Sequence, residues 1–331
     1  MDTGKRFSIS VVIPNYNGKH LLEVNLPSVI EALQYIQLEH EIIVVDDASA
    51  DDSVAHIKQH YPDIHLLVND INLGFSPTVN RGIFAAKYEL VLALNSDVKL
   101  TPDYFKEQLK YFGKPDTFGV MGKIVGHDGK HIQDAAKLPK VTFKGIKGTY
   151  NYIPHSLPAS TWLPSFFLSG ANALIDRKKL LALNGFDEIF APFYFEDADL
   201  GIRAWRVGWK CYFEPQSVCM HAVSSTISKL KSQKVKAIIE RNRIIFNYLH
   251  FTGRQLYFYK CWLLVRCYGK LILGNLVVFR AIQLVRSNLS AVKRSHQALE
   301  TLQKRMNCFY SVQEIKHYIL KQIEKIPYRV F

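Results

Sequence analysis

The chain has 331 residues, of which 48% are hydrophobic and 21% are charged. This composition is typical of globular proteins and excludes a largely disordered chain. The length allows one large α/β domain with an appendage, or two domains. Five cysteines without a Cys-x-x-Cys pair argue against a disulfide framework and a zinc site, and favour a reducing compartment. The N-terminal apolar run is too short for a signal peptide and predicts a first strand.

The net charge of +13 is concentrated in the last third of the chain. Residues 1–225 contain 22 Lys and Arg against 25 Asp and Glu, whereas residues 226–331 contain 20 against 4. This asymmetry is typical of a protein that docks on an anionic surface. We favour phospholipid as that surface, ahead of a negatively charged partner and of nucleic acid. A merely solvated basic face is the alternative.

Apolar runs alternate with helix-like segments over the first 110 residues. The runs at 9–13, 41–45, 64–68 and 90–94 predict strands, and the segments 19–37, 51–60 and 76–87 predict helices. This alternation indicates an α/β fold with a mostly parallel sheet flanked by helices. Ligands of such sheets bind at the carboxyl ends of the strands. Each predicted strand end is polar, so we expect a site there, made by Pro14, Asn15, Tyr16, Asn17, Asp46, Asp47, Asn95, Ser96 and Asp97.

The middle of the chain is less regular. Residues 113–160 are rich in Gly, Lys and Pro, which indicates loops and an edge hairpin. Patterning returns with a strand expected at 166–176, a short helix at 178–184 and a helix at 197–207. These elements complete a first domain that we expect to span residues 1–225.

We expect residues 226–331 to form a basic extension that is helical from Ser228 to its end. Its apolar run 256–292 has no uncharged piece longer than 271–279, far short of the roughly 20 residues of a membrane span. Two or more shorter helices at an interface fit the pattern better. The charges that interrupt the run are Lys260, Arg266, Lys270, Arg280 and Arg286.

Carboxylates are the candidates for chemistry. Asp97 ends a buried strand, where it would bind a divalent metal with phosphate oxygens or cap the helix that follows. Glu196, Asp197 and Asp199 stand beside aromatic residues, where burial favours base character, although a helix N-terminus explains them equally well. His221 follows an apolar stretch and is either a buried imidazole or a metal ligand.

Taken in order, these residues resemble the family-2 inverting glycosyltransferases with the GT-A (nucleotide-diphospho-sugar transferase) fold. The resemblance covers about residues 7–225 and is nearest to the bacterial branch that builds polysaccharides and includes rhamnosyltransferases. It rests on VVIPNYNG at 11–18, IIVVDDASAD at 42–51, NLGF at 72–75, NRG at 80–82, LNSD at 94–97, SGA at 169–171, GFDE at 185–188, FEDADL at 195–200 and His221.

The resemblance implies a role for each matched residue. Asp197 would be the general base, with Glu196 and Asp199 in support. Asp97 and His221 would hold a divalent Mg or Mn ion, although Asn95 replaces the first acid of the family's Asp-x-Asp pattern. The nucleotide-sugar would contact Pro14, Tyr16, Asn17, Asp46, Asp47, Asn80, Arg81, Asn95, Ser96, Gly170 and Ala171.

The implied reaction is a single displacement with inversion at the anomeric carbon. A nucleotide-diphosphate sugar would be the donor, and a glycan or lipid-linked sugar would be the acceptor. We expect a cytoplasmic enzyme on the inner face of the cell membrane, held at the anionic surface by the basic extension, with no nucleic-acid partner. Three rivals are a non-catalytic binder of nucleotide sugars on the same fold, a nucleotidyltransferase, whose Gly-rich basic loop after the first strand is missing here, and a nucleic-acid binder.

Overall fold

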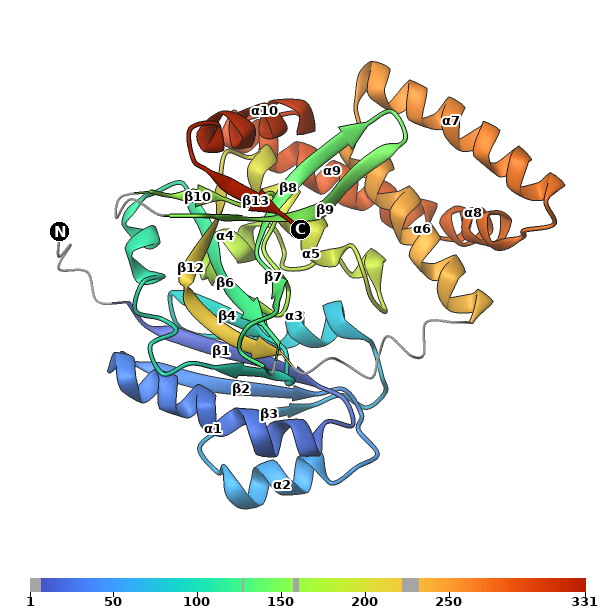
Figure 1. Cartoon of the computed structure of the whole chain (residues 1–331). Coiled ribbons are helices and arrows are strands. Elements are labelled where there is room, and N and C mark those ends of the chain that lie inside the picture. Colours follow the sequence, from blue (N-terminus) through green and yellow to red (C-terminus); the bar gives the residue numbers. More distant parts are fainter. Residues whose placement is uncertain (1–6, 127, 157–160, 222–231) are drawn as a thin grey trace.

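The structure is a computed structural model that describes residues 7–126, 128–156, 161–221 and 232–331. Within these residues a ten-stranded sheet runs through the centre of the molecule (Figure 1). Its strand order is β10-β12-β6-β11-β4-β1-β2-β3, with β5 beside β12 and β7 beside β6. The strands are β1 (Ile9–Asn15), β2 (His40–Asp46), β3 (His65–Val68), β4 (Leu90–Leu94), β5 (Val98–Leu100), β6 (Thr117–Val125), β7 (Ile132–Asp134), β10 (Leu163–Pro164), β11 (Asn172–Asp176) and β12 (Lys210–His221).

The first four strands of the chain confirm the predicted parallel arrangement. β3, β2, β1 and β4 are neighbours and all run in the same direction. β11 is antiparallel to β4 and β6, whereas β6 and β12 are parallel to each other. The parallel strands therefore end at one edge, which is where the candidate residues lie.

Helices cover both faces of this sheet, as predicted. Ile9, Val11 and Ile13 of β1 pack with α1 on one face, whereas Val12 packs with α3 on the other. This alternation follows from the two-residue period of a strand. The helices of this part are α1 (Lys19–Ile36), α2 (Ser53–His60), α3 (Phe75–Ala85), α4 (Arg177–Ala182) and α5 (Glu196–Arg206), with short 3-10 turns η1 (Leu109–Gly113) and η2 (Glu188–Phe190).

The prediction for 113–160 was wrong in part. Its first segment is β6, a nine-residue strand buried at the centre of the sheet. Gly119 and Gly122 hide it from sequence patterning, and both are needed because backbone carbonyls of neighbouring strands lie against them. The hairpin was expected correctly: β8 (Ala136–Thr142) and β9 (Gly145–Pro154) pair in a second sheet. The strand expected at 166–176 comprises only β11, Asn172–Asp176.

From Gln233 onward the chain forms five helices, followed by a short strand near its end. Tyr328, Arg329 and Val330 form β13 (Tyr328–Val330), which pairs with β9 in the second sheet, so the expectation of helix to the end was wrong there. The expected boundary at residue 225 lies outside the described residues. The helices are α6 (Gln233–His250), α7 (Gly253–Ile272), α8 (Val277–Ser287), α9 (Leu289–Met306) and α10 (Val312–Ile323).

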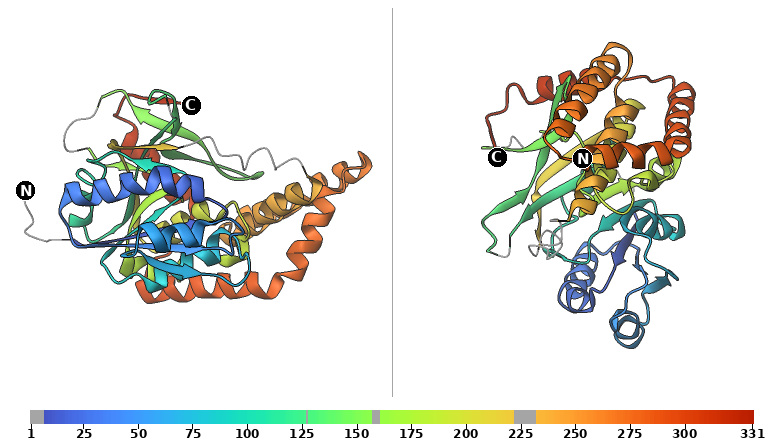
Figure 2. Two further views of the ribbon diagram at one scale, coloured as in Figure 1. Left: turned by 90° about the horizontal axis from the view of Figure 1, so that it is seen from below. Right: turned by 90° about the vertical axis from the view of Figure 1, so that its right-hand side faces the viewer.

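The apolar run 256–292 is divided among α7, α8 and the start of α9, as expected. Figure 2 shows α6 and α7 projecting from the body of the molecule. Among the described residues, no helix combines the length and the apolar character that a membrane crossing requires. All five cysteines are free thiols.

We predict that Gly122→Ala destabilises the protein. A Cβ at this position would lie 2.6 Å from the carbonyl oxygen of Ser217 and 2.8 Å from the Tyr104 ring. Overpacking of this kind costs about 1–3 kcal/mol of unfolding free energy, to be measured by urea denaturation. The matched control is Gly269→Ala in α7, where a Cβ meets open space. The control is expected to be neutral or stabilising by up to about 1 kcal/mol. Equal stability of Gly122→Ala and wild type would contradict this account of β6.

Candidate active site

The site forms at the carboxyl ends of β1, β2 and β4. The parallel register places Asn15 directly opposite Asp46, and β4 ends beside them at Leu94. The structure therefore gathers the polar strand ends that the sequence placed at 14–17, 46–47 and 95–97.

Asp46 is fully buried, and its charge is met by neighbouring donors. The Asn15 amide donates to Oδ1 at 2.9 Å, and the Ser49 hydroxyl donates to the same oxygen at 2.6 Å. The Ser49 backbone N–H donates to Oδ2 at 2.9 Å. Asp46 therefore ties the end of β1 to the loop after β2.

Asp47 fixes the loop between β3 and α3. Its Oδ1 accepts from the Asn69 amide at 2.8 Å and from the Leu73 N–H at 2.9 Å, and its Oδ2 accepts from the Gly74 N–H at 2.9 Å. Gly74 has φ of +86°, so it suits the tight entry into α3. Arg81 donates through Nη1 to the Asn69 side chain and to the Val68 carbonyl, and its Nε and Nη2 have no hydrogen-bond partner among the described residues.

Tyr16 and Asn17 form the rim after β1. Tyr16 is 55% exposed, so its ring is free to pack on a ligand. Asn17 adopts φ of +50° and is held there because its Oδ1 accepts from the Ala50 N–H at 2.7 Å. Pro14, which is half-buried, precedes them.

The segment after β4 is fixed from two sides. The Asn25 amide of α1 donates to the Ser96 carbonyl at 2.9 Å, and the Asn95 N–H donates to the Ala171 carbonyl at 3.1 Å. A Cβ on Gly18 would meet Asn15 Oδ1 at 2.4 Å, so a larger residue here would displace the Asn15 side chain that donates to Asp46. The hydrogen bond from Asn95 to Ala171 brings Gly170 and Ala171 to the same edge of the sheet.

Asp97 and His221 are brought together by strand pairing. β12 pairs with β5 with His221 opposite Val98, and His221 Nε2 lies 3.1 Å from Asp97 Oδ2. The hydrogen bond to Asp97 raises the pKa of His221. Gln133 Oε1 lies 3.1 Å from the other ring nitrogen and orients the imidazole.

The pair fits a divalent cation that also takes ligands from a substrate. Asp97 Oδ1 is buried and has no hydrogen-bond partner among the described residues, so one carboxylate oxygen remains for a metal. Among the described residues no group of three or more His, Cys, Asp and Glu forms a complete cage. Mg²⁺ is commonly bound by one or two carboxylates together with phosphate oxygens, and imidazole is a frequent ligand of other divalent metals.

Asp197 and Glu196 lie in the first turn of α5. Asp197 accepts from the Ala198 N–H at 2.7 Å and from the Gly170 N–H, which places it against the floor of the site. Burial raises the pKa of Asp197. Burial, reinforced by the charge of Asp197, raises the pKa of Glu196 to about 8, and in the described part of the chain Glu196 Oε2 has no hydrogen-bond partner. Because like charges this close disfavour double ionisation, the pair holds one proton near neutral pH.

The segment before Asp197 is held from the C-terminal part of the chain. Tyr194 and Phe195 both have positive φ, which is unfavourable for aromatic residues. Asn242 of α6 is fully buried, and its amide Nδ2 lies 2.7–3.0 Å from the carbonyls of Phe190, Phe193 and Tyr194. Asn242 therefore fixes the backbone that aims Asp197.

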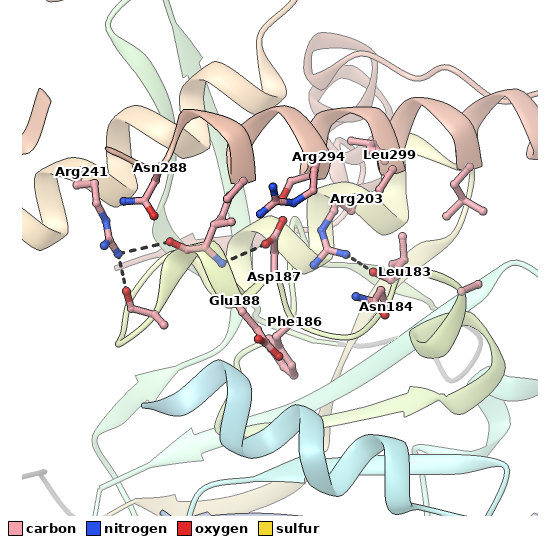
Figure 3. A pocket seen from close by; sticks show the side chains of 17 residues that line it. Leu183, Asn184, Phe186, Asp187, Glu188, Arg203, Arg241, Asn288, Arg294 and Leu299 are labelled. Carbon is pink, nitrogen blue, oxygen red and sulfur yellow. Dashed lines mark hydrogen bonds between the residues drawn. The ribbon is translucent and has the colours of Figure 1, made fainter. Parts of the chain in front are cut away.

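Two arginines extend this support. Figure 3 shows Arg241 reaching the carbonyls of Ile189 and Ala191, while Arg203 reaches that of Leu183. Arg203 Nε also donates to Asp199 Oδ2 at 2.6 Å, and His250 Nε2 of α6 lies 2.9 Å from Asp199 Oδ1. Despite burial, the charges and hydrogen bonds of Arg203 and His250 lower the pKa of Asp199. Asp199 is thus a structural anchor for α5 and points away from the cleft.

Asn80, like Asp199, is buried and is hydrogen-bonded within the protein. Its amide donates to the Phe186 carbonyl at 2.8 Å and to Glu188 Oε1 at 3.0 Å, and its Oδ1 accepts from the Phe186 N–H at 2.8 Å. These bonds use the polar atoms of Asn80 to hold 186–188 against α3. Contact with a nucleotide stays a prediction for this residue.

Several supporting residues escaped sequence reasoning. Asn25, Asn69 and Asn242 are buried amides. Gln133 contacts the imidazole of His221, and His250 contacts the carboxylate of Asp199. The only sequence signal was a polar residue on an otherwise apolar helix face, as for Asn25 between Leu22 and Leu26. Such a residue marks a buried hydrogen bond, but the sequence does not reveal its partner.

We predict that Glu196→Gln changes how stability depends on pH. With a folded-state pKa of about 8 against an ordinary value of 4.5, the folded protein retains a proton that the unfolded chain has lost. Stability therefore falls as pH rises through this window, and the neutral glutamine removes the loss. Urea denaturation should show a larger gain for Glu196→Gln at about pH 8.5 than at about pH 5. Glu31→Gln on the exposed face of α1 is the control for loss of one carboxylate. The buried pair would be refuted if the difference in unfolding free energy between Glu196→Gln and wild type were the same at both pH values.

Comparisons with known proteins agree with this geometry. The family model described as Glycosyl transferase family 2 matches residues 10–182, more than half of the chain. An N-acetylglucosaminyl-diphospho-decaprenol L-rhamnosyltransferase of Mycobacterium tuberculosis is 26% identical over 206 residues, which cover 54% of this chain and 66% of the relative. Chondroitin synthase of Escherichia coli is 25% identical over 62% of this chain and 33% of the relative. The matches thus span two thirds or less of these relatives' own length.

Solved structures show the same fold. A crystal structure of GalNAc-T7 with UDP, GalNAc and Mn²⁺ aligns with a TM-score of 0.63 at 15% identity, over 97% of this chain and 57% of that one. Mannosyltransferase PcManGT of Pyrobaculum calidifontis, in complex with GDP-Man and Mn²⁺, aligns with a TM-score of 0.52 at 16% identity, over 97% and 86%. Both the fold and the family expected from the sequence are confirmed: the chain has the GT-A fold and belongs to glycosyl transferase family 2, where it resembles bacterial rhamnosyltransferases.

Proposed function

We propose that the protein is an inverting glycosyltransferase of polysaccharide synthesis in the cell envelope. It would move a sugar from a nucleotide-diphosphate donor to a hydroxyl of a glycan or lipid-linked acceptor. The observation that carries this proposal is Asp197: a carboxylate whose pKa is raised by burial, aimed by α5 at the edge where the strand ends meet. Such a group is suited to accept a proton.

The donor would lie along the strand ends. Tyr16, exposed at the rim, would pack on the base beside Pro14 and Asn17. Asp46 and Asp47 would contact the base or ribose through lone pairs that their hydrogen bonds leave open, and Arg81 would donate through Nε and Nη2, which have no hydrogen-bond partner among the described residues. Asn95, Ser96, Gly170 and Ala171 would line the sugar and phosphate end.

Asp97 and His221 would hold a Mg or Mn ion. When bound, the ion supplies positive charge that stabilises the departing diphosphate. The unpartnered Asp97 Oδ1 supports this assignment. Nucleotide-bound structures of two proteins with the same fold contain Mn²⁺.

The reaction would be one displacement. Asp197 takes the proton of the acceptor hydroxyl as its oxygen attacks the anomeric carbon from the face opposite the nucleotide. The C–O bond to the diphosphate breaks, and the electron pair leaves with the diphosphate. One base suffices, so no covalent intermediate forms and the anomeric configuration inverts. Glu196, protonated near neutral pH, would share the proton of the pair and limit the charge beside Asp197.

A non-catalytic nucleotide-sugar binder on the same fold is the second candidate. It would use the strand ends in the same way but would not need a carboxylate with raised pKa against the floor at Gly170. The presence of Asp197 and Asp97 favours the enzyme.

The decisive experiment measures nucleotide diphosphate release from a panel of nucleotide sugars with Mn²⁺ or Mg²⁺. We expect slow release from one donor, abolished by EDTA and lowered by roughly 10²-fold or more in Asp197→Asn because the base is lost. Thermal shift with the same nucleotides separates binding from turnover, and Asp63→Asn, on the surface between α2 and β3, is the control. A product with retained configuration would sink the role of Asp197. If no nucleotide binds, the glycosyltransferase reading fails; binding without turnover for every donor and acceptor favours the binder.

We further propose that residues 226–331 hold a catalytic unit of residues 1–225 at the anionic inner face of the cell membrane. On α7 only Tyr259 is buried, whereas Leu264, Val265, Tyr268 and Ile272 are each about 70% exposed. An apolar surface this large on a single helix is typical of a docking face. Arg254 and Lys260 on the same helix supply charge for an anionic surface, at about 1 kcal/mol for each cation near it.

We predict that α7 mediates vesicle binding. The full chain should sediment with anionic phosphatidylglycerol vesicles at low salt and stay in the supernatant with neutral phosphatidylcholine vesicles. Leu264→Glu combined with Val265→Glu should abolish sedimentation, because two carboxylates would enter the apolar contact. Val24→Glu, exposed on α1, is the matched control. Unchanged sedimentation of the double variant would refute the assignment of α7.

A further inference from the structure

A cavity of about 420 Å³ opens beside Asp197. It lies between the tip of the β8–β9 hairpin, the start of α5 and α6, and none of the residues assigned to nucleotide or metal lines it. The space is therefore separate from the proposed nucleotide and metal sites and has room for a second ligand beside Asp197.

The walls of this cavity are aromatic. Its lining includes Phe166, Phe167, Tyr194, Phe195 and Phe246. Phe166 and Phe246 are at most 2% exposed and close the bottom of the cavity, whereas Tyr194 is 40% exposed, so the Tyr194 ring can pack against the apolar face of a sugar or an isoprenoid chain. Asn247 fixes the hairpin tip to α6, because its Oδ1 accepts from the Ile146 N–H at 2.7 Å.

The cavity also carries three cations: Lys144, Lys147 and Arg243. Arg243 Nη1 lies 3.0 Å from Glu240 Oε2, but Glu240 is shared with Arg266, so the two guanidiniums exceed the one carboxylate. Among the described residues neither Lys144 nor Lys147 forms a salt bridge, and the Lys144 ammonium lies 5.5 Å from the centroid of the Phe143 ring. Apart from Asp197, the charged lining is positive.

We infer that Lys144, Lys147 and Arg243 form an anion subsite for the phosphate or diphosphate that joins the acceptor sugar to a lipid. This inference rests on the proposed function and adds the class of acceptor: an anionic, isoprenoid-linked sugar rather than a neutral glycan. The cations bind the phosphates, the aromatic walls contact the adjoining sugar or isoprenoid, and the sugar hydroxyl faces Asp197. The donor's diphosphate keeps its own place at Asp97 and His221.

The test uses farnesyl diphosphate as the probe and farnesol as its uncharged counterpart. Isothermal titration is done on the full chain in EDTA, which keeps a metal away from Asp97. We expect binding of farnesyl diphosphate, no comparable binding of farnesol, and roughly tenfold or greater weakening in the combined variant Lys144→Gln, Lys147→Gln, Arg243→Gln. Lys140→Gln is the matched control, since Lys140 lies on the same hairpin, is exposed, and does not line the cavity. Asp197→Asn should bind the probe more tightly, because it removes the negative charge of the lining.

Each outcome separates this inference from the proposed function. Equal affinity of the triple variant and wild type overturns the subsite even if Asp197→Asn abolishes transfer. Weakened probe binding together with full activity of Asp197→Asn leaves the subsite standing and removes the proposed base. Sedimentation with phosphatidylglycerol vesicles identifies the source of the phosphate. If the triple variant loses vesicle binding in proportion to its loss of probe affinity, the cations serve the bilayer and the inference is overturned.

Discussion

One buried amide determines where the candidate base points. Asn242 of α6 holds the carbonyls of Phe190, Phe193 and Tyr194, and the chain reaches α5 through two aromatic residues with positive φ. Backbone of this kind is unfavourable by about 1–3 kcal/mol per residue and persists only where its surroundings fix it. His250 adds a second attachment through Asp199. The basic last third of the chain is therefore part of the active-site framework as well as the candidate for membrane contact.

The carboxylates of the site fall into two groups by how their charge is met. Asp46, Asp47 and Asp199 receive several donors each, so they act as ties between loops and helices. Glu196 Oε2 and Asp97 Oδ1 are buried, and no described residue donates a hydrogen bond to them. An unpaired polar atom in a protein interior is unfavourable unless a proton, a metal or a substrate meets it. The second group therefore marks where protons and cations would bind, and the first group marks what keeps these positions fixed.

Local patterning predicted the half of the sheet made by β1 to β4 because those strands are unbroken apolar runs with polar ends. It failed at β6, where Gly119 and Gly122 replace the apolar residues that a central strand normally shows. Packing against Leu174 and Ser217 selects glycine there, and no local signal reports that packing. The same limit applies to Asn80, whose place in the motif predicts a ligand contact but whose amide holds 186–188.

The sequence by itself determined the parallel α/β core, the residues at its strand ends and the family, because these depend on short-range periodicity and on ordered motifs. Tertiary structure decided which of those residues meet. The register of β12 on β5 places His221 beside Asp97, and α6 returns to the mouth of the sheet to complete the walls around Asp197. Asp97 and His221 are 124 positions apart, and α6 also lies far beyond the range of local patterning from Asp197. Only the packed fold brings such residues within hydrogen-bonding distance.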